Sequence, residues 1–173
     1  MNRDNVSNVT AKSSSDRRSG CPVSISLDVV GDRWSLLIVR DIMVRGYRTF
    51  REFQRAGEGI ATNILSDRLR KLEAAGILST EPATDGRSTH YMLTEKGIAL
   101  APVLLELLIW AGNHEVTGAP PSFIAEMEQN RAAILAETFR RWQERDPAPI
   151  IPPFKALEKP QTADPLPKGK SKR

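Results

Sequence analysis

A polar face on one expected helix carries the residues of this sequence that are best suited to chemistry. Within residues 59–78, GIATNILSDRLRKLEAAGIL, leucines recur at spacings of four and three and so share one side of a helix. The other side carries hydroxyl, amide, carboxylate and guanidinium groups: Thr62, Asn63, Ser66, Asp67 and Arg70. Asn63 can bond an adenine edge or a phosphate, and Arg70 a guanine edge or a phosphate. Asp67 can accept from a cytosine amino group or orient a neighbouring arginine.

Basic residues are concentrated around this face. Residues 33–71 hold nine Lys or Arg against four acids, a local surplus of +5 in a chain of net charge +4. Such a surplus suits an anion-binding surface, and a solvated basic helix is the alternative. Arg48 and Arg51 flank a short expected helix, where they could contact phosphates or only water. Arg68 lies between the two faces, and an ion pair with Glu73 or another acid is the alternative to a phosphate contact.

Periodicity and capping residues predict the elements that position these groups. Asp32 and Thr49 are expected helix caps, and Gly46 is an expected helix end. The expected helices are 23–30, the core helix after Asp32, 50–56 and 61–75, and a hairpin follows with strands at 77–82 and 90–93. The hairpin turn is TDGRS, residues 84–88, with Arg87 at its basic tip. A phosphate or minor-groove contact by Arg87 is expected, with ordinary solubility as the alternative.

Two further helices are expected after the hairpin. An apolar helix runs from Thr94 to about Trp110, in which Pro102 introduces a kink or a change of register. An amphipathic helix follows at about 122–145. The protein is therefore predicted to be mainly α with a small β hairpin. Three helices, the third polar on one face, followed by a hairpin form a winged helix-turn-helix domain, here with C-terminal dimerisation helices.

Composition excludes several other classes of protein. The 173 residues, 40% of them hydrophobic, can bury one core, and the expected compartment is the cytoplasm, because no long uncharged apolar run and no secretory signal is found. Cys21 is the single cysteine, so no internal disulfide framework or multi-cysteine zinc site is expected. His90 and His114 lie near no nucleophile or paired carboxylate that spacing reveals, and no phosphate-binding glycine loop occurs. No enzyme activity, cofactor or metal is expected.

Five motifs in order resemble the HxlR-type transcriptional regulators, which are relatives of MarR. CPVSISLDVVGDRWSLLIVRDIM is similar to the opening of that family, and RTFREFQRAGEGIATNILSDRLRKLEAAGIL and HYMLTEKGIALAPVL are similar to its middle and end. The resemblance covers residues 21 to about 112. It implies a cytoplasmic homodimer that binds operator DNA, with the recognition helix at 61–75, the wing at 82–88 and dimer contacts from the N- and C-terminal helices.

The resemblance also gives Cys21 a candidate role. The cysteine before proline in this family often senses electrophiles or oxidants, which requires an exposed thiolate of lowered pKa. The alternative is a cysteine that only begins a helix. Since the sequence has one cysteine, an intersubunit disulfide would need Cys21 of both protomers.

These observations divide the chain and define two functional hypotheses. The expected parts are a disordered arm at 1–20, the DNA-binding domain at 21–115, an additional C-terminal helix at 116–145 and a Pro/Lys-rich disordered tail at 146–173. The first hypothesis is a sequence-specific dimeric repressor or activator that responds to a small molecule or redox signal. The alternative is a winged-helix module for protein contacts, which should carry apolar anchors at positions such as 63, 66 and 70.

Overall fold

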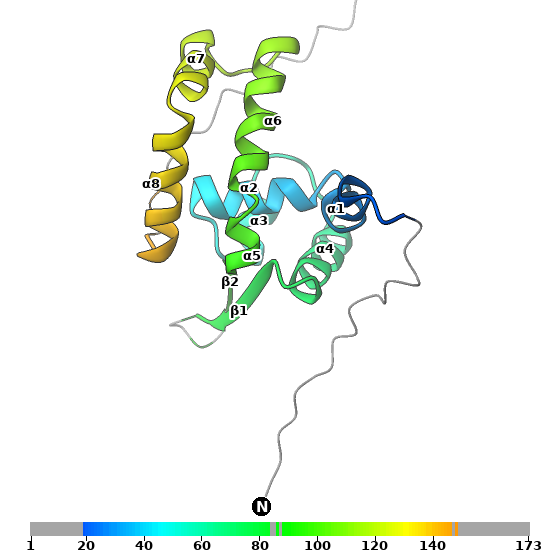
Figure 1. Cartoon of the computed structure of the whole chain (residues 1–173). Coiled ribbons are helices and arrows are strands. Elements are labelled where there is room, and N and C mark those ends of the chain that lie inside the picture. The colour runs from blue at the N-terminus through cyan, green and yellow to red at the C-terminus, as the bar shows by residue number, and fades with distance from the viewer. Residues whose placement is uncertain (1–18, 84–85, 87, 147, 149–173) are drawn as a thin grey trace, which may run out of the picture.

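The computed structural model describes residues 19–83, 86, 88–146 and 148, which form a helical protein with one hairpin (Figure 1). Its first helices are α1 Pro22–Val30, α2 Ser35–Arg45, α3 Phe50–Gln54 and α4 Thr62–Ala74. The antiparallel hairpin is β1 Leu78–Pro82 and β2 Thr89–Leu93, with Leu78 opposite Leu93. The remaining helices are α5 Glu95–Ile98, α6 Ala101–His114, α7 Pro121–Gln129 and α8 Arg131–Gln143. The predicted fold class is confirmed, as is the hairpin, and α2, α3 and α4 form the three-helix unit in which α4 is the third helix.

Local signals explain where the first helices begin and end. Asp32 Oδ1 accepts from the backbone N–H groups of Trp34 at 2.9 Å and Ser35 at 3.1 Å, so Asp32 caps the turn before α2, whereas the residue that directly precedes the helix is Trp34. Gly46 ends that helix with φ 72°, a left-handed conformation that favours glycine. Thr49 caps α3 through a reciprocal capping box with Glu52. These short-range bonds fix the connections around α3, and so the approach of the chain to α4.

The main core lies between α2, α4 and the base of the hairpin. Leu65, Leu69 and Leu72 of α4 are at most 2% exposed, and Val39 of α2 is fully buried. Phe53 joins α3 to this core and makes an edge-to-face contact with a tyrosine of β2 at 6.0 Å. One side of α4 is therefore fixed against the domain, and the hairpin is attached to the same core.

The base of the hairpin is joined tightly to α5. Thr94 donates its backbone N–H to the Ile77 carbonyl at 3.1 Å, and its hydroxyl donates to the Gly76 carbonyl at 2.6 Å. A Cβ atom at Gly97 would lie 2.2 Å from the Ile77 carbonyl oxygen. Only glycine allows α5 to approach this closely, so the hairpin leaves the domain at a defined position.

The expected apolar helix is two helices, α5 and α6. Pro102 lies in the first turn of α6, where its missing N–H leaves no intrahelical bond unmade, so it begins a helix and does not kink one. By length and composition alone the segment Glu95–His114 could cross a membrane. Core helices pass the same test, and here Leu105 and Ile109 are buried against α7 and α8.

The prediction of a single helix within 116–145 is wrong, because Asn130 separates α7 from α8. The Asn130 backbone has φ −111° and ψ 23°, and both its N–H and its side-chain amide donate to the Glu126 carbonyl. The backbone bond is the last one of α7, and the side-chain amide competes with backbone donors for the same carbonyl, which disfavours a continuing helix. The two helices fold back along α6 (Figure 1), and Ile124 of α7 packs so closely on Gly112 of α6 that a Cβ there would lie 2.4 Å away.

Several sequence-based expectations lie outside the described residues. They are the arm up to residue 18, most of the tail after residue 146, and Thr84, Asp85 and Arg87 of the hairpin turn. The expected DNA contact by Arg87 therefore stays a prediction.

Candidate nucleic-acid interface

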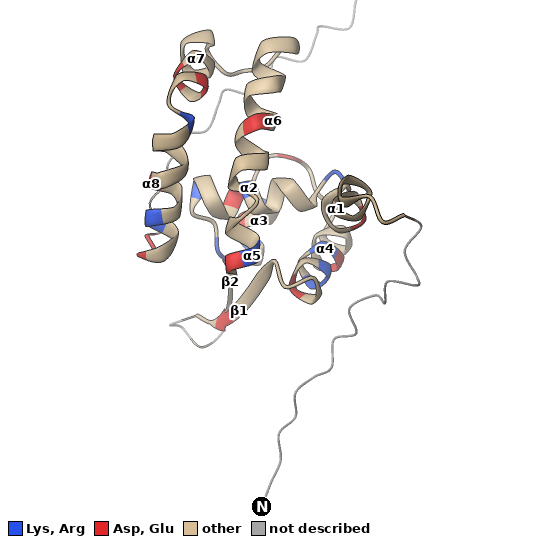
Figure 2. Cartoon of the chain, viewed as in Figure 1, with Lys and Arg blue, Asp and Glu red and all other residues tan. Residues whose placement is uncertain are grey.

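The polar face of α4 is exposed as its sequence spacing predicts. Thr62, Asn63, Ser66 and Arg70 are all exposed, whereas the leucines between them are buried. Figure 2 shows the basic residues along α4, on a helix at the edge of the domain. The Ser66 hydroxyl donates to the Thr62 carbonyl of its own helix at 3.0 Å, so its oxygen can still accept a hydrogen bond.

Asp67 organises the basic side chains next to this face. Its Oδ1 lies 2.8 Å from Arg70 Nη2, and its Oδ2 lies 2.9 Å from Lys71 Nζ. The bond from Lys71, followed by that from Arg70, lowers the pKa of the Asp67 carboxyl. Asp67 thus orients an arginine, one of the two roles expected for it, while the Arg70 side chain stays 76% exposed.

Arg68 forms ion pairs within the domain. Its Nη1 lies 3.1 Å from Asp32 Oδ2 and its Nη2 lies 3.2 Å from Asp67 Oδ2, with 23% of the side chain exposed. Burial favours a raised pKa for Asp32, but bonds from the Ser35 hydroxyl and two backbone N–H groups, with Arg68, lower it overall. The ion-pair alternative for Arg68 is therefore present, with Asp32 as partner in place of the expected Glu73. This pair joins α4 to the start of α2.

The two arginines beside α3 differ in their surroundings. Arg48 Nη1 donates to the carbonyls of Ile42 and Tyr47, both at 2.9 Å, and the Arg48 carbonyl accepts from the Tyr91 N–H at 2.7 Å. Burial lowers the pKa of the Arg48 guanidinium. Arg48 therefore joins the end of α2 to β2. Arg51, on α3, is exposed.

A buried carboxylate that sequence analysis missed connects α2 to the turn before α4. Asp41 is 3% exposed, and its Oδ1 lies 2.8 Å from Arg40 Nη2 and 3.1 Å from Arg45 Nη1. Arg40 also pairs with Glu58 at 3.0 Å, and Arg45 donates to the Ala56 carbonyl at 3.2 Å. Burial raises the pKa of Asp41, and the two arginines oppose that rise. Charged residues on an otherwise apolar helix, with Asp41 and Arg45 four apart, were the available signal.

Cys21 is exposed and immediately precedes α1. Backbone N–H groups of Ser24 and Val23, at the first turn of that helix, lower the pKa of its thiol. The positive end of a helix stabilises a thiolate in this way. Exposure and a lowered pKa are two properties that a sensing cysteine requires.

The helices, the hairpin and the outward polar face of α4 together define a winged helix-turn-helix protein. The family model for the HxlR-like helix-turn-helix matches residues 29–117, about half of the chain, and the chain belongs to that family. Its members are transcriptional regulators and not enzymes, and this membership implies a place in the cytoplasm.

Several known proteins are similar over the same region. The HTH-type transcriptional regulator YybR of Bacillus subtilis, itself uncharacterised, is 36% identical over 94 residues, which cover 54% of this chain and 74% of YybR. The solved structure of PA1607, suggested to be a transcription factor, is 43% identical with a TM-score of 0.55 and covers 60% of this chain and 71% of PA1607. The oxidised form of the redox regulator HypR is 34% identical with a TM-score of 0.51 and covers 56% of this chain and all of HypR.

The charge on Asp32 should contribute to stability in a pH-dependent way. Asp32→Asn keeps an oxygen that can cap the turn before α2 but removes the charge paired with Arg68, so we expect the free energy of unfolding to fall by about 1 kcal/mol at pH 7. Because the folded pKa of Asp32 is lowered, this contribution is complete above the unfolded pKa of about 3.9 and is lost as the pH falls through the folded value.

Urea unfolding of the wild type and Asp32→Asn at neutral and acidic pH measures the difference in their free energies of unfolding. Asp32→Ala, which also removes the cap, is the comparison and should lose more stability than Asp32→Asn at pH 7. A difference between wild type and Asp32→Asn that persists unchanged below both pKa values contradicts the assignment.

Proposed function

We propose that this protein is a dimeric regulator that binds specific duplex DNA with α4 in the major groove. The observation that carries this proposal is the division of α4 into a buried leucine side and a polar side on which Thr62, Asn63, Ser66 and Arg70 are exposed. In a winged helix-turn-helix domain this helix reads base edges, and the hairpin follows the DNA backbone or enters the minor groove. Asn63 and Arg70 are the proposed base-reading residues, with Thr62 and Ser66 contacting either bases or phosphates.

The proposed roles of the other basic residues follow from their contacts. Arg51 is exposed at α3 and is proposed to contact a phosphate. Arg87 keeps a proposed contact with the backbone or minor groove, on the basis of its place in the hairpin turn. The guanidinium of Arg48 is held by two carbonyls, and that of Arg68 by two carboxylates. We assign both primarily to positioning the interface.

The alternative function, a module for protein contacts alone, receives less support from the same face. A protein-binding surface concentrates its affinity in large apolar or aromatic anchors. The exposed positions 63, 66 and 70 are Asn, Ser and Arg. Hydrogen-bonding groups without an apolar anchor suit DNA better than a protein partner.

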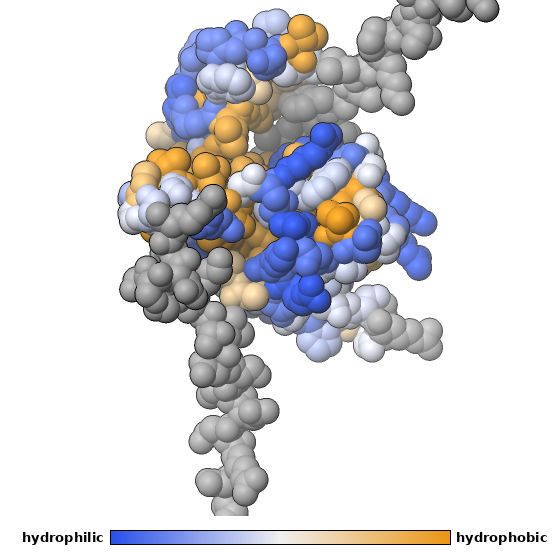
Figure 3. Space-filling model, turned by 90° about the vertical axis from the view of Figure 1, so that its right-hand side faces the viewer, coloured by the Kyte–Doolittle hydropathy of each residue, from blue (hydrophilic) through white to orange (hydrophobic). Residues whose placement is uncertain are grey.

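Exposed apolar residues on α1 and α6 support a homodimer. Leu27 of α1 is 62% exposed, and Trp110 of α6 is 56% exposed. Val103, Leu107 and Trp110 share one face of α6 by their spacing, whereas the opposite face is buried under α7 and α8. The side of the molecule that carries α1 and α4 shows a hydrophobic patch among hydrophilic residues (Figure 3). Apolar surface of this kind is usually covered by a partner, here a second copy.

We propose that Cys21 is a redox or electrophile sensor and is not required for DNA binding itself. Its exposure and lowered pKa support reactivity, and HypR, a similar protein, is a redox regulator. Its position before α1 is remote in sequence from α4, which supports the second part. A small-molecule effector is the other signal to which such a regulator could respond.

Separate substitutions should distinguish base contacts from phosphate contacts. Binding is measured on a duplex selected from a random pool and on a scrambled duplex. Asn63→Ala should reduce the difference in binding free energy between the two duplexes by about 1–3 kcal/mol. Arg51→Ala should weaken binding to both duplexes alike. It should also lower the slope of log affinity against log salt concentration by about one. Arg131→Ala removes a partly exposed charge at the N-terminal end of α8 and should change neither the affinity for the two duplexes nor the salt slope. If Asn63→Ala and Arg51→Ala both fold but bind the two duplexes as the wild type does, the protein-contact alternative is favoured.

The dimer should depend on the apolar face of α6. Light scattering at micromolar concentration should give twice the mass of one chain for the wild type, and Leu107→Glu should shift it toward one chain because a charge enters an apolar contact. Val116→Glu, at an apolar residue exposed in the connection after α6, is the matched control and should leave the dimer intact. A monomeric wild type overturns the dimer.

Cys21→Ser should bind selected DNA as the wild type does under reducing conditions. After treatment with a mild oxidant or a quinone, DNA affinity should change for the wild type only, because serine forms no thiolate. Gel shifts with and without the oxidant measure both points. Failure of the reduced variant to bind contradicts dispensability, and an equal response of both proteins contradicts sensing by Cys21.

A further inference from the structure

The C-terminal end of α8 lies against the hairpin, although the two segments are distant in sequence. Trp142 Nε1 donates to the carbonyl oxygen of Leu93, the last residue of β2, at 2.8 Å. The indole packs at the edge of the main core, beside a small pocket of about 30 Å³ between α8, α2 and β2. This end of α8 therefore contacts the base of the hairpin through Trp142.

A second contact joins α8 to the outer part of the hairpin. Arg145 Nη1 lies 3.2 Å from both carboxylate oxygens of Glu81. Glu81 is the next-to-last residue of β1 and pairs in register with His90 of β2. The hairpin is thus held by α8 at two points, at Leu93 near the domain and at Glu81 near the turn.

Arg145 is held in a backbone conformation that is unusual for a residue with a side chain. Arg145 has φ 54°, the one positive φ among the described residues other than glycine. Its N–H donates to the Trp142 carbonyl and the next N–H donates to the Arg141 carbonyl, the bond pattern of a Schellman motif. Glycine is the residue that this position favours. An arginine here accepts backbone strain and places its guanidinium on Glu81.

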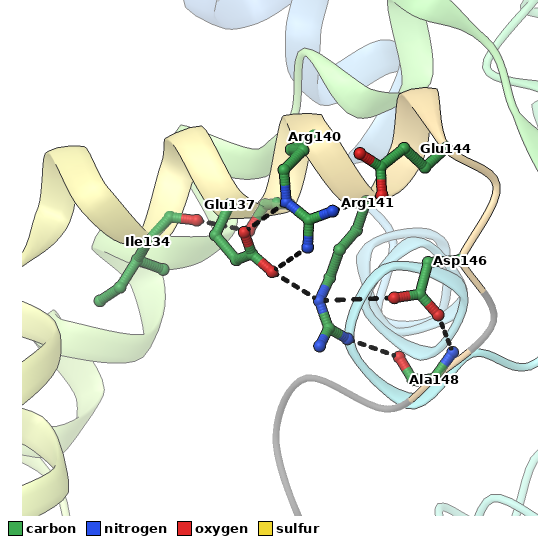
Figure 4. A network of polar contacts seen from close by, with 8 residues as sticks. Ile134, Glu137, Arg140, Arg141, Glu144, Asp146 and Ala148 are labelled. Atoms are coloured by element: carbon green, nitrogen blue, oxygen red, sulfur yellow. Dashed lines mark hydrogen bonds and ion pairs between the residues drawn. The ribbon is translucent and has the colours of Figure 1, made fainter.

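Ion pairs along α8 keep this helix end in place (Figure 4). Arg141 Nε lies 2.9 Å from Glu137 Oε1 and 3.8 Å from Asp146 Oδ2, and Arg141 Nη1 donates to the Ala148 carbonyl at 3.0 Å. Arg140 pairs with Glu137 and with Glu144 on the same helix. The network reaches across the turn that carries Arg145, so the position of Arg145 is defined by its neighbours as well as by its own backbone.

We propose that α8 is a brace for the hairpin and that Trp142 and Arg145 are positioning residues for DNA binding. The proposal rests on the proposed function of α4 and the hairpin in binding DNA. Two-point attachment limits the pivoting of the hairpin about its base, so that it is held in one orientation relative to α4 before DNA arrives. Binding then orders less of the protein and is tighter.

A double-mutant cycle on Arg145 and Glu81 tests the brace. Arg145→Gln and Glu81→Gln should each weaken binding to selected duplex about two- to fivefold, the range that an exposed ion pair supplies, and the double variant should weaken it no further. Loss of an acid near DNA would by charge alone strengthen binding. Weaker binding by Glu81→Gln is therefore specific to the brace.

Two further variants separate positioning from folding. Arg145→Gly suits the left-handed backbone, so its thermal midpoint should be equal or higher while its DNA affinity falls. Trp142→Phe keeps an aromatic ring but loses the bond to Leu93 and should also bind more weakly. Arg131→Gln breaks the ion pair between Arg131 Nε and Glu106 Oε1 (2.7 Å) at the opposite, N-terminal end of α8 and is the matched control, expected to bind as the wild type does.

Amide hydrogen exchange of β1 and β2 in the free protein gives a readout that needs no DNA. It should be faster in Arg145→Gly and Trp142→Phe than in the wild type and the control. Additive effects in the cycle, tighter binding by Glu81→Gln, or unchanged exchange overturn the brace. A wild type that binds no duplex overturns the proposed DNA function instead, and the exchange experiment still decides whether α8 restrains the hairpin.

Discussion

Burial of the α4 leucines is the constraint on which the interface depends. With Leu65, Leu69 and Leu72 packed under the domain, α4 cannot rotate about its axis without exposing large apolar side chains. The residues between them must then face outward, and all of the proposed base contacts are among these. The hydrophobic effect thus selects which polar groups can reach a partner, and it does so before any partner is bound.

Charge has two separate roles in the basic region between residues 33 and 71. Asp41 and Asp32 retain several arginines inside the domain, where they connect α2 to the turn before α4 and to α4 itself. Such ion pairs specify geometry more than they add stability. The exposed cations, Arg51 and Arg70 among them, are the part of the surplus that can attract DNA. Counting basic residues in the sequence therefore overestimates the charge available to DNA.

Elements with a strong local signal could be predicted from the sequence. The period of the α4 leucines, the caps at Asp32 and Thr49, and Gly46 each fix structure within a few residues, so the fold and the exposed face followed from them. Asn130 gave a weaker signal, because the apolar period continues across the break between α7 and α8 and masks the local competition of an asparagine side chain.

The partners of charged residues were harder to predict. Arg68 pairs with Asp32, thirty-six positions away, and Arg48 turns inward to two carbonyls. Both outcomes depend on how the helices pack, which spacing along one helix does not encode. Arg145 and Glu81 are still further apart in the sequence, and their contact requires α8 to fold back along α6.

The exposed side of α4 is the surface proposed to meet DNA. Nuclear magnetic resonance of the isotope-labelled full chain, titrated with duplex selected from a random pool, measures this residue by residue. The largest changes in backbone amide shifts should fall on α4, at Thr62, Asn63, Ser66 and Arg70, with smaller changes in the hairpin. Duplex binding that leaves these four amides unchanged, or shifts confined to α7 and α8, would contradict the account.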